Sequence, residues 1–126
     1  MEKKDSGQVI KNSLEVGKDI VERAEKITVQ RLITEKDGSS NIRMRKFTLE
    51  PEGKMGLHKH DNTEHVQYVL KGVIKIIFNE VEKTVKEGDA VFIPENTPHS
   101  YENIGKTRAE FLCMIPTVDV HTEILE

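Results

Sequence analysis

Residues 56–65 read Gly56-Leu57-His58-Lys59-His60-Asp61-Asn62-Thr63-Glu64-His65, and this short stretch holds three of the five histidines in the chain. A fourth, His99, ends the segment Pro94-Glu95-Asn96-Thr97-Pro98-His99. Alternate residues of a β-strand share one face, so His58 and His60 point the same way, as two ligands of one metal ion must. If the turn at 61–63 sends the chain back antiparallel, His65 opens the neighbouring strand and points into the same space. A His-x-His pair alone is weak evidence, but the two segments together predict a metal site.

Short β-branched runs separated by turn signals make up most of the remaining chain. A first run covers 27–33 and is followed by a turn at 37–40. The later runs cover 42–49, 57–60, 65–70, 73–78, 83–85, 90–93, 99–103 and 108–115, with Pro51-Glu52-Gly53 as one of the turn signals between them. Strands at such regular spacing, with no convincing helix between them, predict an all-β sandwich or barrel.

The two ends of the chain are expected to lie outside this barrel. Apolar residues before Ile27 recur at helical spacing, but Gly17 weakens a helix, and Val9-Ile10 could equally form a short strand on a sheet edge. We expect an N-terminal arm and edge strand over 1–41, a barrel over 42–116, and a C-terminal tail over 117–126 that covers an edge or meets a partner.

Composition excludes several classes of function. The chain has 126 residues, 33% of them charged, and a net charge of −3 with both signs mixed throughout, which argues against binding to nucleic acid or to a membrane surface. No stretch approaches the roughly eighteen apolar residues of a membrane span, and no apolar signal region follows Met1. The single cysteine, Cys113, excludes an intrachain disulfide. We therefore expect a single-domain cytoplasmic protein.

Both histidine segments resemble the motifs of the cupin family, G-x5-H-x-H-x3,4-E-x6-G and G-x5-P-x-G-x2-H-x3-N. The second is matched at full spacing by Gly88, Pro94, His99 and Asn103, with Asn96 in place of its second glycine. Asparagine is the residue other than glycine that best tolerates a positive φ, so the turn can survive this exchange. The first is matched by His58, His60 and Gly72, with Gly53 one residue closer than usual. The resemblance covers about residues 42–116 and implies the cupin fold, an all-β double-stranded β-helix or jelly-roll barrel.

The informative departure from the first motif is at its glutamate. Glu64 leaves seven residues before Gly72, whereas His65 leaves the required six and also has an allowed spacing from His60. By count, His65 occupies the glutamate position. The resemblance therefore implies a four-histidine variant with His58, His60, His65 and His99 as metal ligands. The alternative, Glu64 as third ligand with His65 turned outward, stays open.

A neutral ring in place of a carboxylate leaves such a site with the full positive charge of its metal. The site should favour a small anionic or chelating molecule that supplies the missing negative charge. Four protein ligands would complete a tetrahedral Zn site, whereas six-coordinate Mn, Fe or Ni keeps two adjacent positions open. We therefore expect one divalent transition metal, with manganese, iron or nickel favoured and zinc possible.

Strand alternation also selects side chains around the metal. Arg45 points inward if the face of Phe47 is the interior, and could then pair with a substrate carboxylate; a solvated arginine is the alternative. Gln67 and Tyr101 each lie two residues after a ligand histidine and could hydrogen-bond substrate or a ligand ring. We assign structural roles to the remaining candidates: core for Met44, Phe92, Phe111 and Met114, and surface for His121.

The resemblance allows two classes of function. One is a metal-dependent enzyme acting on a small oxygenated or carboxylated molecule, of the dioxygenase, decarboxylase or isomerase type. The other is a non-catalytic protein that binds a metal and a small anion. No residue is a convincing general base, because the motif histidines are occupied as ligands. Proteins similar to cupins commonly dimerise, so we expect a homodimer formed through the residues before Ile27 or after Pro116.

Overall fold

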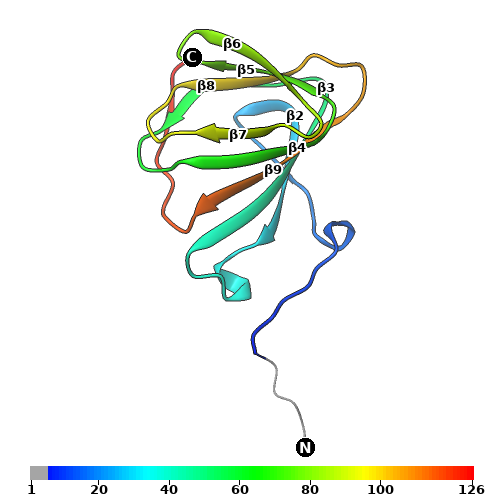
Figure 1. Ribbon diagram of the computed structural model, residues 1–126, viewed down its shortest axis with the longest axis vertical. Helices are drawn as coiled ribbons and strands as arrows, with labels where there is room; N and C mark the ends of the chain where they lie inside the picture. The colour runs from blue at the N-terminus through cyan, green and yellow to red at the C-terminus, as the bar shows by residue number, and fades with distance from the viewer. Residues whose placement is uncertain (1–5) are drawn as a thin grey trace, which may run out of the picture.

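A computed structural model describes residues 6–126, which form ten strands and two 3₁₀ helices of three residues each (Figure 1). No helix in this part of the chain is long and apolar enough to cross a membrane. The all-β prediction is confirmed. In chain order the elements are η1 (Ser13–Glu15), β1 (Asp19–Ile20), β2 (Ala24–Ile33), η2 (Glu35–Asp37), β3 (Ile42–His60), β4 (His65–Lys71), β5 (Val73–Phe78), β6 (Val81–Lys86), β7 (Ala90–Ile93), β8 (His99–Asn103), β9 (Ala109–Pro116) and β10 (Thr122–Ile124).

One long strand, β3, organises the sheet. The strands follow the order β6-β5-β8-β3-β9-β4-β7, with antiparallel pairing along this path. The half of β3 up to Leu49 pairs with β9, whereas the half from Lys54 onward pairs with β8. β3 therefore belongs to both walls of the curled sheet that closes into a barrel (Figure 1).

A bulge at Pro51-Glu52-Gly53 separates these two halves. The sequence predicts a strand boundary here, and this prediction is wrong, because 42–49 and 57–60 are parts of one strand. The register with β2 jumps from Leu49 to Lys54, and Glu52 has a φ of 70°. A Cβ on Gly53 would lie 2.8 Å from a backbone oxygen, so glycine is required. Since bulges bend strands, the turn signal redirects β3 instead of ending it.

Strand alternation fills the interior from both walls. β9 alternates buried and half-buried residues along its whole length, and β8 does the same. The same alternation that buries Phe111 in β9 buries His99 and Tyr101 in β8. The histidines therefore project from core-facing positions of regular strands. The apolar core around them includes Leu49, Val69, Ile74, Ile76, Phe111 and Ile115.

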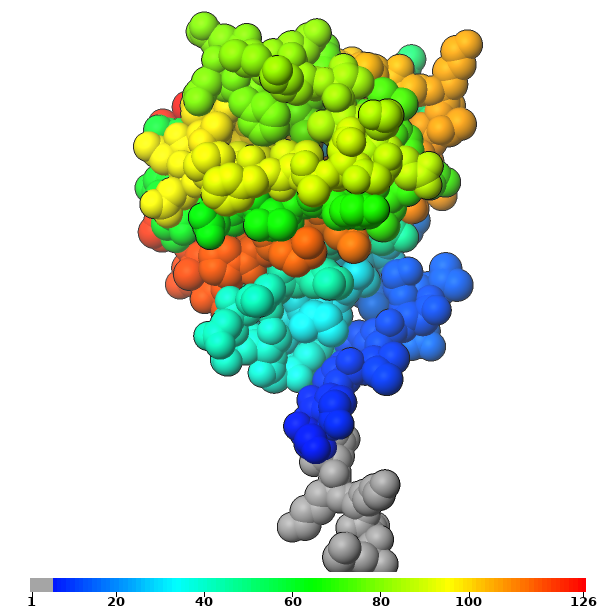
Figure 2. All heavy atoms as spheres, viewed as in Figure 1, coloured from blue at the N-terminus to red at the C-terminus, as the bar shows by residue number. Residues whose placement is uncertain are grey.

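The two ends of the chain differ in how they attach to the barrel. Residues 1–5 of the predicted arm lie outside the described residues. The helical pattern before Ile27 forms only the single turn η1, and Val9-Ile10 is not in a strand. Figure 2 shows the arm, in blue, leading away from the barrel. At the other end β10 pairs with β3, Thr122 opposite His60, so the tail covers a strand edge, one of the two roles expected for it.

Candidate metal centre

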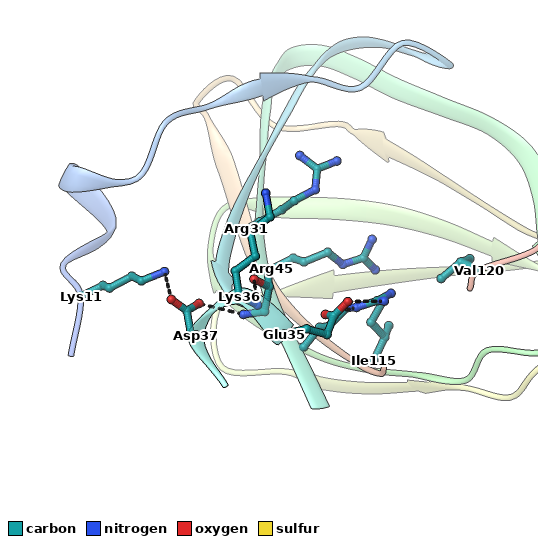
Figure 3. A pocket seen from close by; sticks show the side chains of 10 residues that line it. Lys11, Arg31, Glu35, Lys36, Asp37, Arg45, Ile115 and Val120 are labelled. Atoms are coloured by element: carbon teal, nitrogen blue, oxygen red, sulfur yellow. Dashed lines mark hydrogen bonds and ion pairs between the residues drawn. The ribbon is translucent and has the colours of Figure 1, made fainter. Parts of the chain in front are cut away.

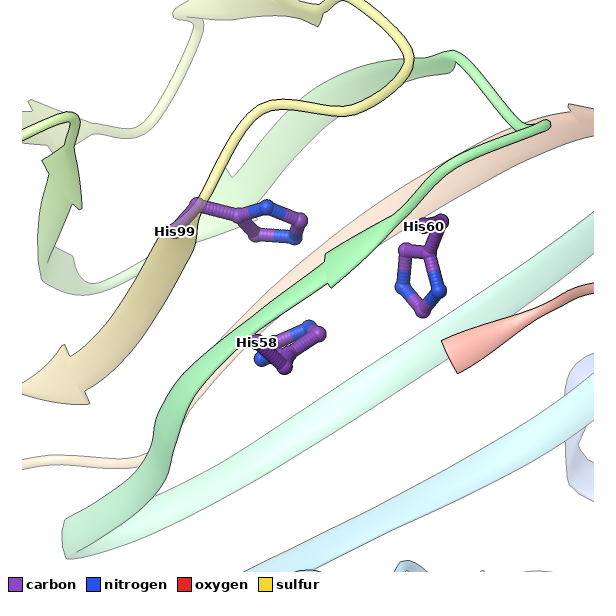
Figure 4. A group of neighbouring side chains, drawn as sticks. All are labelled: His58, His60 and His99. Atoms are coloured by element: carbon purple, nitrogen blue, oxygen red, sulfur yellow. The ribbon is translucent and has the colours of Figure 1, made fainter. Parts of the chain in front are cut away.

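Two histidines face one another on neighbouring strands. His58 of β3 and His99 of β8 are directly opposite in the register, with ring centroids 4.3 Å apart. His60 shares this face, and its ring centroid lies 5.1 Å from that of His58. One ligand atom from each of the three rings lies within 4.8 Å of the others, and all three residues are buried (Figure 4). Three imidazoles this close can hold a metal ion.

The fourth histidine, His65, arrives by a route other than the one predicted. β4 does not pair with β3; it pairs with β7 and β9, while the end of β3 pairs with β8 and β10. The expected hairpin is wrong because residues 61–64 carry the chain to the opposite wall of the barrel. The ring of His65 nevertheless stacks on that of His60 at 4.9 Å and lies 5.7 Å from that of His99. Four rings from three strands therefore gather at one place.

Backbone carbonyls orient two of the rings. The Nδ1 of His58 lies 2.8 Å from the carbonyl oxygen of Gly56, and the Nδ1 of His99 lies 2.8 Å from that of Thr97. A carbonyl can only accept, so Nδ1 carries the proton of each neutral ring and Nε2 keeps a lone pair. Histidines that bind metals show this arrangement.

Side chains hold the other two rings. The hydroxyl of Thr122 lies 3.0 Å from the Nδ1 of His60, and the Sγ of Cys113 lies 3.3 Å from the Nδ1 of His65. The Nε2 atoms of His65 and His99 are buried without a hydrogen-bond partner. Because a buried polar atom without a partner costs free energy, a metal ion bound to these nitrogens would satisfy them. The residues present therefore fit a metal ion.

Burial keeps the four imidazoles neutral. It lowers the pKa of His58 to about 4, that of His60 to about 3 and that of His65 to about 2, and it also lowers the pKa of His99. The positive charges of nearby arginines lower these pKa values further. Since neutral imidazole is the form that binds metals, protons do not compete for the rings at neutral pH.

The three other predicted site residues all face this interior. The Nη2 of Arg45 lies 3.3 Å from the Sγ of Cys113, and its guanidinium lies 5.0 Å from the ring centroid of Phe47. The Nε of Arg45 is buried without a hydrogen-bond partner. Gln67 donates from Nε2 to the hydroxyl of Tyr101 at 2.8 Å. Burial raises the pKa of Tyr101, so this hydroxyl keeps a proton that it can donate to a ligand.

A cavity of about 10 Å³ lies among these side chains. This is roughly the space that one water molecule needs, so a larger ligand must extend beyond it. Within the described part of the chain its lining contains no aspartate or glutamate. The protein therefore supplies no carboxylate to neutralise a cation bound there.

Three residues of this lining, Arg23, Met55 and Cys113, were not identified from the sequence as site residues. Arg23 comes from the turn before β2, and no motif spacing marks it. Cys113 was considered only for disulfides. Strand alternation could have found it, because residue 113 shares its face with Phe111.

The predicted core residues divide between the two faces of the sheet. Phe111 is buried as expected, and Met44 and Met114 are half-buried. The prediction for Phe92 is wrong, since this side chain is 57% exposed. Its neighbour Ile93 takes the inward position and is fully buried, so alternation turns Phe92 outward.

Two remaining residues lie at the surface. Glu64 is exposed, whereas the adjacent His65 is buried. His121 is exposed as expected, and its Nδ1 lies 3.4 Å from the carboxylate of Asp61.

Comparisons with known proteins agree with the fold. A sequence profile described as a cupin domain matches residues 45–115. An uncharacterized protein of Methanocaldococcus jannaschii is 40% identical over 72 residues, which span 56% of this chain and only 58% of that protein. The oxalate-binding protein of Thermotoga maritima is 29% identical over 115 residues, 79% of this chain and 95% of that protein. The structure of the polyketide cyclase RemF from Streptomyces resistomycificus superposes with a TM-score of 0.88 and 25% identity, covering 94% of this chain and 86% of the cyclase.

Proposed function

This chain belongs to the cupin domain family, and on that basis we propose that it holds one divalent transition metal and uses it to bind a small anionic molecule. The proposed ligands are His58, His60, His65 and His99. The observation that carries this proposal is the pair of buried, unpaired Nε2 atoms on His65 and His99. A purely structural role would leave both atoms desolvated without compensation.

We propose manganese, iron or nickel as the metal, with zinc as the less suitable ion. Four imidazoles leave a six-coordinate ion two adjacent positions for a ligand, whereas they saturate tetrahedral zinc. The metal would act as a Lewis acid and as a template for a chelating ligand.

The electrostatics of the cavity support an anion as that ligand. Its lining has no acidic residue among those described, and the guanidinium of Arg45 adds a positive charge. The similarity to an oxalate-binding protein points in the same direction. In this proposal Arg45 binds a carboxylate of the ligand, and Tyr101, held by Gln67, donates a hydrogen bond to it.

The site supports a catalytic and a non-catalytic version of this function. Similarity to a polyketide cyclase over most of the chain favours an enzyme. We propose that such an enzyme would be metal-dependent and would act on a small oxygenated or carboxylated molecule, as a dioxygenase, decarboxylase or isomerase. Similarity to an oxalate-binding protein favours binding alone. With the histidines as ligands and Tyr101 protonated, the protein offers no evident general base, so catalysis would depend on activation by the metal.

Calorimetric titration with oxalate tests the shared claim. Protein loaded with Mn²⁺ should bind oxalate, and the same protein stripped with a chelator should not. Equal binding by the two forms would contradict the proposal. Oxygen uptake or carbon dioxide release that requires the metal would then identify an enzyme, and binding without turnover would identify a binding protein.

We further propose that the protein is a homodimer. Ile10, Leu14 and Ile20 of the arm are 96%, 93% and 78% exposed, which is unusual for large apolar residues. On the outer face of the barrel, Val66 and Phe92 are opposite each other in the register and are also exposed. Light scattering should give twice the chain mass, and Phe92→Asp together with Leu14→Asp should reduce it. A monomer at micromolar concentration would contradict this.

A further inference from the structure

Three arginines gather at the mouth of the barrel. Arg31 of β2 and Arg45 of β3 are directly opposite in the antiparallel register, and Figure 3 shows their side chains pointing the same way. Arg23 lies in the turn that precedes β2 and lines the metal cavity together with Arg45. Like charges directly opposite on a sheet are destabilising. Such a cluster therefore calls for a compensating anion.

The chain neutralises its other arginines with carboxylates. Arg43 and Arg108 each make a two-pronged contact with a glutamate, and Arg31 pairs with Asp19. Among residues 6–126, neither Arg23 nor Arg45 has a carboxylate within ion-pair distance. The buried Nε of Arg45 also has no hydrogen-bond partner. Two guanidinium groups beside the metal cavity are thus left without a counter-charge.

A cleft of about 440 Å³ adjoins these two groups. It shares Arg23, Arg45 and Phe47 with the metal cavity, so these three side chains border both spaces. Arg31 also lines the cleft, and Glu22 is its one acidic residue among those described. The metal cavity itself has room for roughly one water molecule. The cleft can hold the rest of a ligand.

We propose that Arg23 and Arg45 form a second anion subsite, so that the ligand is a small acid with two separated anionic groups. One end chelates the metal, and a distal carboxylate enters the cleft and binds the two guanidinium groups. This inference rests on the proposed function and adds the class of ligand: an acid longer than oxalate, with a charge at each end.

Matched pairs of acids test the distal charge. Malate and 2-hydroxybutyrate have the same four carbons and the same chelating hydroxy acid, and differ in the distal carboxylate. The five-carbon acids 2-hydroxyglutarate and 2-hydroxypentanoate form a second pair that differs in the distal carboxylate. Titrated into the Mn²⁺-loaded protein, the diacid should bind about tenfold or more tightly than its partner at one of the two lengths, as a charge-assisted contact predicts.

Variants locate the origin of this preference. Arg23→Gln and Arg45→Gln should each bring the ratio of diacid to monoacid affinity towards one, whereas Lys83→Gln, which removes an exposed cation on β6, should leave the ratio intact. Metal content and thermal unfolding of each variant show whether the metal centre and fold remain. No preference at either length, or a preference that survives both arginine variants, would overturn the inference alone. Failure of all four acids to bind a protein that does bind oxalate would also overturn the inference alone. Failure of oxalate as well would overturn it together with the proposed function.

Discussion

The Nδ1 of His65 lies 3.3 Å from the Sγ of Cys113, although 48 residues separate them in the chain. Cys113 sits directly opposite Gln67 in the register of β4 and β9, and His65 lies two residues from Gln67 on the same face. The sulfur therefore fixes the ring of a proposed metal ligand from the opposite strand.

We predict that Cys113→Ala weakens metal binding about tenfold to a hundredfold, because loss of a partner that orients a ligand histidine has effects of this size. Cys113→Ser keeps a hydrogen-bonding atom at this position and should lose less. Competition with a chelator of known affinity measures both. Equal affinity in Cys113→Ala and the unchanged protein would show that the sulfur does not position His65.

Gly72 provides a test of the packing that brings β4 and β9 together. It has a φ of 87°, and a Cβ there would lie 2.6 Å from the Cβ of Ala109. Gly72→Ala should therefore cost about 2 to 5 kcal/mol in the free energy of unfolding, from both backbone strain and overpacking. Gly88 has a φ of 92° but open space around it, so Gly88→Ala should cost only about 1 to 2 kcal/mol. Denaturant unfolding measures both, and equal losses would contradict the packing argument.

The metal-free protein should lose stability as the pH falls below about 6.5. Unfolded histidines bind protons there, whereas the folded pKa is about 4 for His58 and about 3 for His60. The free energy of unfolding is therefore highest above pH 6.5 and falls as the pH approaches the pKa values of the folded state. At about pH 5 the loss is on the order of 2 kcal/mol for each such histidine.

Urea unfolding at about pH 7.5 and about pH 5 checks this pH dependence. His60→Gln should reduce the difference in the free energy of unfolding, whereas His121→Gln, which changes an exposed ring, should not. The same stability at both pH values would indicate that the rings are not desolvated in the folded protein.

Spacing between residues predicted the fold and the convergence of the histidines. Gly88, Pro94, His99 and Asn103 keep the family spacing, and at Gly88 and Asn103 the structure shows a local physical reason for the residue. Asn103, for example, donates from its side-chain amide to the carbonyls of Leu49 and Thr107 and so ties three segments together. Asn96, which stands where the motif has glycine, has the positive φ expected of it, 62°. Local requirements of this kind can be predicted from a sequence.

Relationships between distant strands were not predictable in this way. Closure of the barrel decides that β4 pairs with β9 instead of β3. The sequence of residues 61–64 does not indicate which of these strands β4 will pair with. A sequence such as Pro51-Glu52-Gly53 can form either a turn or a β-bulge. Only the pairing of β3 with β2 shows that it forms a bulge here. Arg23 enters the site from a turn whose position depends on β1 docking on β2. These features depend on tertiary contacts, which short-range patterns do not encode.

Elemental analysis of two single variants tests the four-histidine centre most directly. His65→Ala and Glu64→Ala change adjacent residues, one buried beside His60 and one exposed, and circular dichroism confirms that each is folded. We predict that the unchanged protein and Glu64→Ala each retain one equivalent of a divalent transition metal, and that His65→Ala loses it. Retention of the metal in His65→Ala with loss in Glu64→Ala would contradict the proposed ligand set.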